Sequence, residues 1–171
     1  MSTGPASGRE QHAAFPKIAA TLDYPMIVVT TAAGEERSGC LVGFSTQCSI
    51  DPAHYAVFIS KKNQTADVAA RAETIVVHVL RPEDKALARL FGEETGDEIP
   101  KFEQCSWHAG PGGAPVLDSC DWFAGRILER VDAGDHVLHI LDITDEGRAT
   151  RTDQGVLGFQ DVRDLEAGHH P

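Results

Sequence analysis

The sequence predicts a mainly β protein, an antiparallel barrel that carries a few helices. Three observations favour this class. About six runs have the β-branched, apolar composition of strands, only two segments have helical spacing, and no regular alternation of strand and helix is present. The 171 residues suit a single domain that buries its own core.

The strands expected in the first half of the chain are residues 26–31, 38–44, 55–60 and 74–80. The first two form a hairpin, because Gly34 stands in the turn between them. The other two read YAVFIS and TIVVHVL, and they are apolar on both faces. We therefore expect them inside the barrel or beneath helices.

Two helices are expected at residues 65–72 and 83–91, the first from its alanine content and the second from its apolar spacing. In the second half of the chain, residues 122–131 alternate, which places Phe123, Ile127 and Val131 on one face of a strand. A turn at residues 132–135 then leads into a strand over residues 136–143, which predicts a second hairpin.

The remaining segments define the expected domain organisation. Residues 92–113 carry Gly, Pro and charge without a regular period, and this length is typical of a working loop, so they are a candidate lid. We expect a disordered N-terminal arm over residues 1–14, the folded domain over residues 15–163 and a C-terminal tail over residues 164–171.

Charge excludes several classes of partner. The chain has 15 basic and 26 acidic residues and a formal net charge of -11, which argues against nucleic acid or an anionic membrane surface. No apolar run approaches the roughly 18 residues of a membrane span, and the first residues lack the apolar centre of a secretory signal. We expect a cytoplasmic protein in which any bound phosphate is held by local contacts.

The four cysteines, Cys40, Cys48, Cys105 and Cys120, are widely spaced, with no CxxC pair and no Cys/His cluster. Free, mostly buried thiols are expected, and no metal site is expected.

The first segment with possible chemistry is residues 60–65, SKKNQT, where a strand ends and a helix starts. Unpaired N–H groups at a helix start, with nearby lysine and hydroxyl side chains, suit a phosphate group. The alternative is an ordinary helix cap beside two solvated lysines.

The second segment is residues 39–52, GCLVGFSTQCSIDP. Its glycines allow a flat ring to approach the backbone, and its hydroxyl groups suit the edge of a heterocycle. The alternative is a strand with a bulge and a polar turn.

Histidines supply the third candidate. His136, in Gly134-Asp135-His136 at the second hairpin, is able to touch a ligand or to have a structural role. His78 and His139 lie within apolar strands and are expected to be core histidines. The sequence has no GxSxG, HExxH, P-loop or GxGxxG motif, so no other chemistry is supported.

Taken in order, these segments resemble the flavin reductase-like family of FMN-binding split barrels. The matching pieces are the run from PMIVVTT to FISKKNQT, then TIVVHVL, Lys101-Phe102, GPGGAPVLD and GDHVLHILDI, and they extend over residues 24–143. The resemblance implies a six-stranded antiparallel Greek-key barrel that forms a homodimer. FMN is the implied cofactor, ahead of FAD or a deazaflavin, and NAD(P)H is the implied co-substrate.

The resemblance also implies roles for individual residues. Gly43, Phe44, Ser45 and Thr46 would run beside the isoalloxazine, with Ser49 close by. The ribityl phosphate would be received by Ser60, Lys62, Asn63 and Thr65. His136 would lie near the flavin and the nicotinamide and would orient or electrostatically tune them, as the one catalytic side chain that can be named. The loop with Phe102 and Trp107 would cover the flavin or reach the partner subunit.

The chain departs from the usual family pattern at Leu41, Gly43 and Phe44, where many members have Thr, Asn and Ser. The implied activity is hydride transfer from NAD(P)H to flavin, with reduced flavin supplied to a monooxygenase. Three alternatives stay open: a flavin carrier without a nicotinamide site, a non-enzymatic ligand-binding barrel, and a pyridoxamine-type oxidase. The last is disfavoured, because no basic cluster beyond Lys61 and Lys62 is available for a second phosphate.

Overall fold

The computed structural model describes residues 13–93, 100–150 and 155–165. Its main sheet contains β1 (Ile27–Ala33), β2 (Glu36–Val42), β3 (Ser45–Ser49), β4 (His54–Ser60), β5 (Thr74–Val79), β8 (Asp121–Ala133) and β9 (His136–Gly147). A separate small sheet pairs β6 (Trp107–Ala109) with β7 (Pro115–Leu117). The helices are α1 (Phe15–Ala19), α2 (Gln64–Ala69) and α3 (Lys85–Gly92), with short 3₁₀ turns η1 (Pro82–Asp84), η2 (Lys101–Glu103), η3 (Pro111–Gly113) and η4 (Phe159–Val162).

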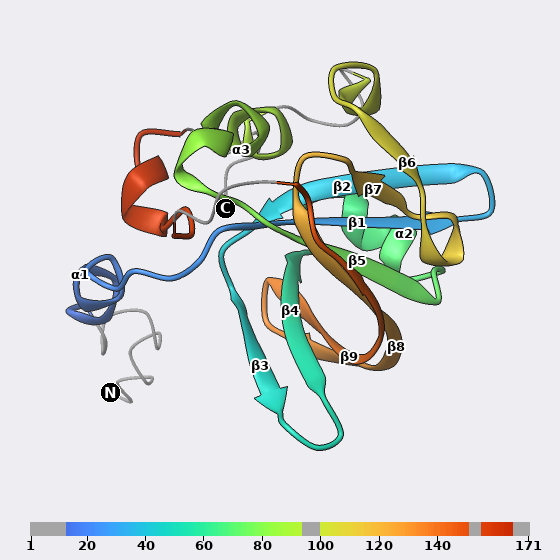
Figure 1. Ribbon diagram of the computed structural model, residues 1–171. Coiled ribbons are helices and arrows are strands. Elements are labelled where there is room, and N and C mark those ends of the chain that lie inside the picture. Colours follow the sequence, from blue (N-terminus) through green and yellow to red (C-terminus); the bar gives the residue numbers. More distant parts are fainter. Residues whose placement is uncertain (1–12, 94–99, 151–154, 166–171) are drawn as a thin grey trace, which may run out of the picture.

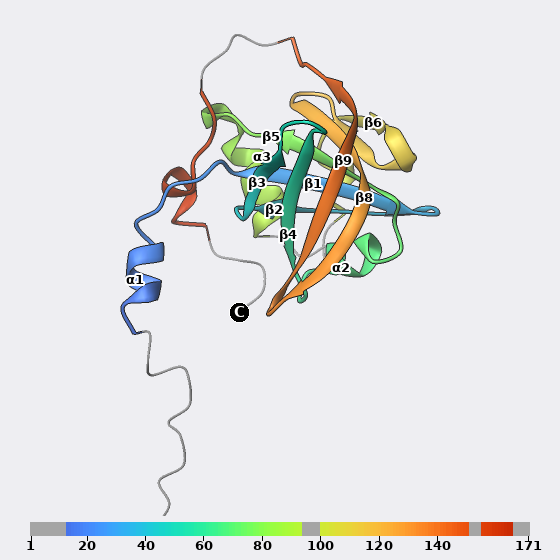
Figure 2. The same cartoon turned by 90° about the horizontal axis from the view of Figure 1, so that it is seen from below.

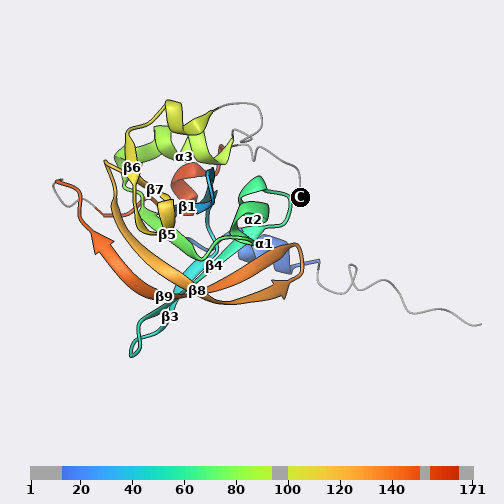
Figure 3. The ribbon, with the colours of Figure 1, turned by 90° about the vertical axis from the view of Figure 1, so that its right-hand side faces the viewer.

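The seven strands of the main sheet are all antiparallel and follow the order β2-β1-β5-β8-β9-β4-β3. The sheet curls strongly, so that β4 and β9 face β1 and β5 across a common interior (Figure 1, Figure 3). Strands β2 and β3 lie at the two ends of this order and are joined only by Gly43 and Phe44. The sheet is therefore a barrel with a split, and the chain crosses the split at these two residues.

The predicted mainly β antiparallel barrel is confirmed, but it has seven strands in the main sheet where six were expected. The extra strand is β3, a segment of Ser, Thr, Gln and Cys whose polar composition resembles a loop. It forms because it pairs along β4 from Ser45↔Val57 to Ser49↔His54. As an end strand with exposed side chains it needs no apolar pattern of its own.

Both predicted hairpins are present. Strands β1 and β2 pair from Ile27↔Val42 to Ala33↔Glu36, and Gly34 adopts a φ of 62° in the turn. Strands β8 and β9 pair up to Ala133↔His136, so the second turn contains only Gly134 and Asp135. Gly134 has a φ of 82°, a conformation that glycine adopts at little cost.

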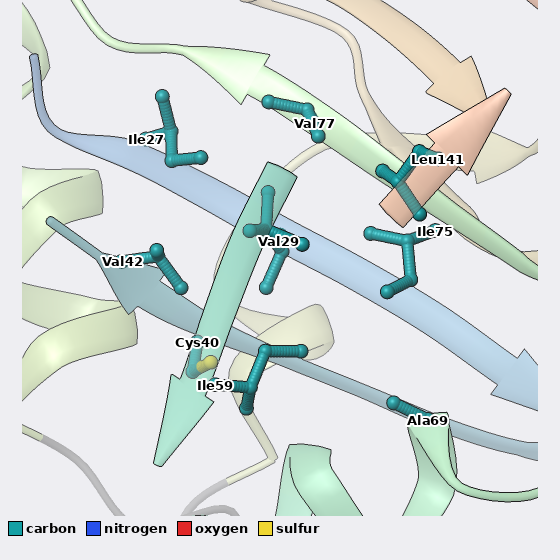
Figure 4. Packing of buried hydrophobic residues seen from close by; sticks show 10 residues of the cluster. Ile27, Val29, Cys40, Val42, Ile59, Ala69, Ile75, Val77 and Leu141 are labelled. Carbon is teal, nitrogen blue, oxygen red and sulfur yellow. The ribbon is translucent and has the colours of Figure 1, made fainter. Parts of the chain in front are cut away.

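The barrel interior is filled by aliphatic side chains from opposite walls. Val29 and Val77 come from one wall and Ile59 and Leu141 from the other, and all four are fully buried (Figure 4). The expectation that residues 55–60 and 74–80 lie inside the barrel or beneath helices is confirmed, since β4 and β5 both contribute side chains to the interior cluster.

The prediction that Phe123, Ile127 and Val131 share one face of β8 is only partly confirmed. Phe123 and Ile127 pack against the interior cluster, but Val131 is 38% exposed. The register shifts between Ile127 and Glu129, where Leu128 is an extra residue opposite β9. A bulge of this kind turns the following side chains to the other face of the sheet.

A second apolar cluster covers the outer face of β1 and β5. It contains Leu80 and Leu117 together with Phe91 of α3 and Leu157 near the C-terminal end, all fully buried. The C-terminal segment is fixed by backbone hydrogen bonds, because Met26 donates to Leu157 at 2.8 Å and Leu157 donates to Leu80 at 2.8 Å. The barrel is thus closed on this side by α3, the segment of residues 100–117 and the C-terminal segment (Figure 2).

The segment proposed as a lid packs against the core over the part described. Residues 94–99 of this segment lie outside the described residues. Phe102 and Trp107 pack on the second apolar cluster, and their rings meet edge to face at 5.6 Å. Lys101 is buried there as well. Apolar burial holds these side chains against the core, and the covering of a bound flavin by this segment stays a prediction.

Both helix predictions are confirmed with shifted ends. Helix α2 covers Gln64–Ala69 instead of residues 65–72, and α3 covers Lys85–Gly92 after the turn η1. Of the predicted termini, residues 1–12 and 166–171 lie outside the described residues. Helix α1 lies beside the barrel with no buried residue (Figure 1). No helix in the described part of the chain is long and apolar enough to span a membrane.

The cysteines are free, as expected, but only two are fully buried. Cys40 and Cys120 lie in the core, whereas Cys48 on β3 is exposed and Cys105 is half-buried. No group of three or more potential metal ligands occurs among residues 13–93, 100–150 and 155–165.

Candidate active site

A cavity of about 230 Å³ opens at the split of the barrel. Its lining brings together the end of β2, the crossing residue Phe44, the end of β4, the start of β9, α3 and the C-terminal segment. The lining residues are Met26, Cys40, Leu41, Val42, Phe44, Phe58, Ser60, Asn63, Phe91, Gly92, His136, Phe159, Val162 and Leu165. Four of these, Phe44, Ser60, Asn63 and His136, are predicted site residues.

The predicted phosphate segment, residues 60–65, and the segment with His136, residues 134–136, meet because β4 and β9 pair. The last pair of this ladder is Ser60↔His136, so the end of one segment lies beside the start of the other. Two further contacts fix them together, since the Lys61 N–H donates to the Asp135 carbonyl at 2.9 Å and Lys61 Nζ donates to Asp132 Oδ2 at 2.7 Å. The polar end of the cavity is therefore built from two segments that lie more than 70 residues apart in the chain.

The other end of the cavity is aromatic. The Phe44 ring lies 5.4 Å from the His136 ring, centroid to centroid, and 5.9 Å from the Tyr24 ring, which stacks on Phe159 at 4.8 Å. Phe44 is 52% exposed, so one side of its ring is open to a ligand. A Cβ at Gly43 would lie 2.6 Å from Tyr24 Cε2. Gly43 thus allows the Tyr24 ring to support Phe44.

The predicted phosphate segment is ordered mainly by its own hydrogen bonds. Asn63 caps α2, because its Oδ1 accepts from the Thr65 N–H at 2.9 Å. The Ser60 hydroxyl accepts from the Lys62 N–H at 3.4 Å. The Thr65 hydroxyl points inward, where it bonds the Ser38 hydroxyl at 2.9 Å and is fully buried. Ser60 and Asn63 are the two side chains of this segment that reach the cavity.

His136 is held in one orientation by its neighbour. Its Nδ1–H donates to Asp135 Oδ1 at 2.7 Å, which leaves Nε2 as the ring nitrogen able to meet a ligand. The hydrogen bond from His136 lowers the pKa of the Asp135 carboxyl below its usual value. An ionised Asp135 therefore fixes the tautomer and the plane of the ring.

The structure does not bring every predicted residue to the cavity. Ser45 bonds the Tyr55 hydroxyl at 3.0 Å, Thr46 bonds a neighbouring backbone carbonyl, and Ser49 lies at the far end of β3. Lys62 is exposed beside the polar end.

The two histidines of the apolar strands, His78 and His139, lie in the core. Both ring nitrogens of His78 are used, at 3.0 Å from the Val28 carbonyl and 3.0 Å from the Leu117 N–H. His139 is also buried, at 1% exposure. The expectation of core histidines is confirmed.

The family model described as "Flavin reductase like domain" matches residues 19–164. The chain belongs to this family.

Two curated relatives illustrate the range of flavin reductase-like domains. The high molecular weight rubredoxin of Moorella thermoacetica is 30% identical over 128 residues, which is 73% of this chain and 56% of that protein. The 4-hydroxyphenylacetate 3-monooxygenase reductase component of Salmonella typhimurium is 29% identical over 138 residues, 78% of this chain and 80% of that protein. The chain spans between 36% and 57% of the length of four curated relatives, the rubredoxin included.

Solved structures share the fold of this flavin reductase-like domain. The NADH:FAD oxidoreductase of Streptomyces globisporus superposes with a TM-score of 0.77 at 18% identity, covering 92% of this chain and 93% of that one. At this level of identity the likeness establishes the fold.

The cavity of the flavin reductase-like domain fits a flavin in its chemistry. It has an apolar, aromatic end for a flat ring at Leu41 and Phe44, and a hydroxyl and an amide for a phosphate at Ser60 and Asn63. Its volume of about 230 Å³ is somewhat below the roughly 300 Å³ at which ligand pockets usually begin. The cavity of one chain would therefore enclose a flavin only in part.

Sequence reasoning missed the C-terminal wall of this cavity, formed by Phe159, Val162 and Leu165. These residues are spaced by three, which gives a weak signal of a helical face. Leu165 was assigned to the tail, yet it packs on the second apolar cluster.

Proposed function

We propose that this chain is a flavin reductase that binds FMN in the cavity at the split and transfers hydride from NADH or NADPH to it. The observation that carries the proposal is the meeting of Phe44, Ser60, Asn63 and His136 around one cavity, although they come from three separate segments. Membership of the flavin reductase-like family supports the same assignment.

The residues of the chain have distinct tasks in this proposal. Ser60 and Asn63 bind the phosphate, assisted by the charge of the exposed Lys62. Leu41, Val42 and Phe44 form the apolar wall beside the ring and exclude water from it. A bound flavin supplies the hydride acceptor, so the chain contributes positioning.

His136 is the proposed catalytic residue. Its Nε2 is directed by the hydrogen bond from Nδ1 to Asp135, and its ring faces Phe44. It orients the nicotinamide against the flavin and adjusts the local electrostatics, while hydride transfer itself requires no acid or base from the chain.

We further propose a homodimer. The cavity is small for a flavin, and apolar side chains stay exposed along β3, with Phe44 at 52% before its start and Ile50 at 85% beyond its far end. A second copy against this face would complete the binding site and cover these side chains. The reduced flavin then serves a monooxygenase, as the name of the Salmonella relative describes for that protein.

Anaerobic reduction tests the proposal. The purified protein is loaded with FMN, its visible spectrum is recorded, and NADH or NADPH is added without oxygen. We expect the visible flavin band to bleach within seconds. If the protein binds FMN and stays yellow with both nucleotides, it is a flavin carrier. If it never binds FMN, it is neither a flavin reductase nor a flavin carrier.

A further inference from the structure

Four aromatic rings form a continuous row from the C-terminal segment to the proposed catalytic histidine. Phe159 stacks on Tyr24 with 4.8 Å between the ring centroids and 19° between the ring planes. Tyr24 meets Phe44 edge to face at 5.9 Å, and Phe44 lies 5.4 Å from the His136 ring. Phe159, Phe44 and His136 line the flavin cavity, whereas Tyr24 does not. The proposed function gives Tyr24 no task.

The C-terminal segment fixes the position of Tyr24. The Tyr24 carbonyl accepts from the Phe159 N–H at 2.9 Å, and the next residue, Pro25, forms an isolated β-bridge with Gly158. The Tyr24 ring is half-buried and has Phe159 and Phe44 as neighbours. Because both its backbone and its ring are held, Tyr24 is able to support an adjacent side chain.

Phe44 is a side chain that needs such support. It lies in the two-residue connection between β2 and β3, and it is 52% exposed. Its backbone is fixed, because the Phe58 N–H donates to the Phe44 carbonyl at 3.0 Å, but a half-exposed ring has other rotamers available. The ring contacts with Tyr24 and His136 favour one of them, since aromatic pairs stabilise beyond the area that they bury.

Gly43 makes the contact between Tyr24 and Phe44 possible. A Cβ at residue 43 would lie 2.6 Å from Tyr24 Cε2, and the φ of Gly43 is not positive, so the close ring and not the backbone conformation requires a glycine. Gly43 and Phe44 are also two of the positions at which the chain departs from the usual family pattern of Asn and Ser. An Asn side chain would collide with Tyr24 and a Ser side chain has no ring, so Tyr24, Gly43 and Phe44 form one unit.

We infer that Tyr24 is a positioning residue of the flavin site and acts through Phe44 on the isoalloxazine ring. It holds the Phe44 ring as a fixed wall, so that the stacking surface is in place before the ligand arrives. Tyr24 therefore contributes to the binding of the ring end of the ligand and not to that of the phosphate end at Ser60 and Asn63. The inference rests on the proposed flavin site and adds a residue to it.

Calorimetric titration with FMN and riboflavin separates the two ends of the ligand. Tyr24→Leu removes the support and Tyr24→Phe keeps the ring. Tyr55→Leu is the matched control, because the Tyr55 ring meets Phe123 edge to face at 4.9 Å and does not line the flavin cavity. We expect Tyr24→Leu to weaken FMN and riboflavin binding by the same factor, about three- to tenfold, which is the strength of one aromatic pair. The other two variants should stay within about twofold of the wild type.

The visible circular dichroism of the bound flavin gives a second readout. At saturating FMN its amplitude should decrease in Tyr24→Leu, because the ring has a less ordered wall beside it. Tyr24→Phe should restore the amplitude of the wild type, and Tyr55→Leu should not change it.

Gly43→Ala tests the same contact without removing a ring. The added methyl group displaces Tyr24 from Phe44, so we expect the same loss of riboflavin affinity as in Tyr24→Leu. In the double variant the two losses should not add, since no ring is left for the methyl group to displace. Gly43→Ala also keeps the test decisive if Tyr24→Leu does not fold.

Other outcomes overturn the inference. Unchanged riboflavin affinity in Tyr24→Leu or Gly43→Ala, a loss confined to FMN, or an equal loss in Tyr55→Leu means that Tyr24 does not position the ring end. Additive losses in the double variant mean that Gly43 and Tyr24 act separately. Failure of the wild-type protein to bind either flavin contradicts the proposed function itself, so the two failures are distinguishable.

Discussion

The stability of the protein should fall steeply on mild acidification because of two buried histidines. His78 is fully buried, and desolvation lowers its pKa to about 4. Its Nε2 accepts from the Leu117 N–H, so Nδ1 carries the proton that bonds the Val28 carbonyl, and the neutral ring is completely used. Burial, aided by the charge of Arg130, also lowers the pKa of His139 to about 4.

The unfolded chain has histidine pKa values of about 6.5. Between pH 6.5 and 4 the unfolded chain therefore binds protons that the folded chain excludes, and the free energy of unfolding decreases as the pH falls. Each pH unit costs about 1.4 kcal/mol per histidine, so His78 accounts for about 2 kcal/mol between pH 6.5 and 5. His139 adds a similar amount at most.

The variant His78→Gln isolates this contribution, because an amide offers one donor and one acceptor but does not titrate. Urea unfolding at pH 6.5 and 5 measures how far the free energy of unfolding falls between these two pH values. We expect it to fall by up to about 4 kcal/mol for the wild type, and the decrease for the variant should be smaller by about 2 kcal/mol. His108→Gln is the control, since the His108 side chain is 60% exposed. An equal loss in the wild type and His78→Gln would show that His78 does not titrate as a buried neutral group.

Three further predictions concern the flavin site. His136→Ala should slow anaerobic flavin reduction at least about tenfold while FMN affinity stays within about threefold, because the side chain orients the reactants without holding the phosphate; loss of all bound flavin in a calorimetric titration would refute this role. Ser60→Ala should weaken FMN binding about tenfold or more but leave riboflavin binding unchanged, since riboflavin lacks the phosphate, and equal weakening of both ligands argues against a phosphate contact. Thr65→Val should lower the free energy of unfolding by about 1–2 kcal/mol, because it leaves the buried Ser38 hydroxyl without its partner. FMN affinity should stay the same. A selective loss of FMN binding would instead show that Thr65 contacts the phosphate.

The sequence was sufficient to predict an element where the local pattern and the tertiary structure agree. The hairpins around Gly34 and Gly134 and the buried strands β4 and β5 all carry their own signal in turn residues or apolar runs. The pairing Ser60↔His136 then brings the two predicted segments together.

The sequence was insufficient where a distant partner decides the structure. Strand β3 exists because β4 offers it a free edge, and the bulge at Leu128 depends on the register with β9. Phe102 and Trp107 lie in an irregular stretch, and only the second apolar cluster determines that they pack inward. The C-terminal wall of the cavity depends on the hydrogen bonds between Leu157 and the ends of β1 and β5.

The Thr65 hydroxyl shows the same limit within the site. Its place after Asn63 at the start of α2 fits a phosphate ligand by sequence, but the side chain of a residue in the first helical turn can point either to solvent or to the sheet. Here the buried Ser38 hydroxyl on β2 provides the partner.

The most direct test of the proposed flavin site is a crystal structure of the protein soaked with FMN. We predict electron density for the flavin in the cavity at the split, with the phosphate in hydrogen-bond distance of Ser60 and Asn63 and the ring beside Phe44 and His136. Flavin density at another surface, with this cavity empty, would contradict it.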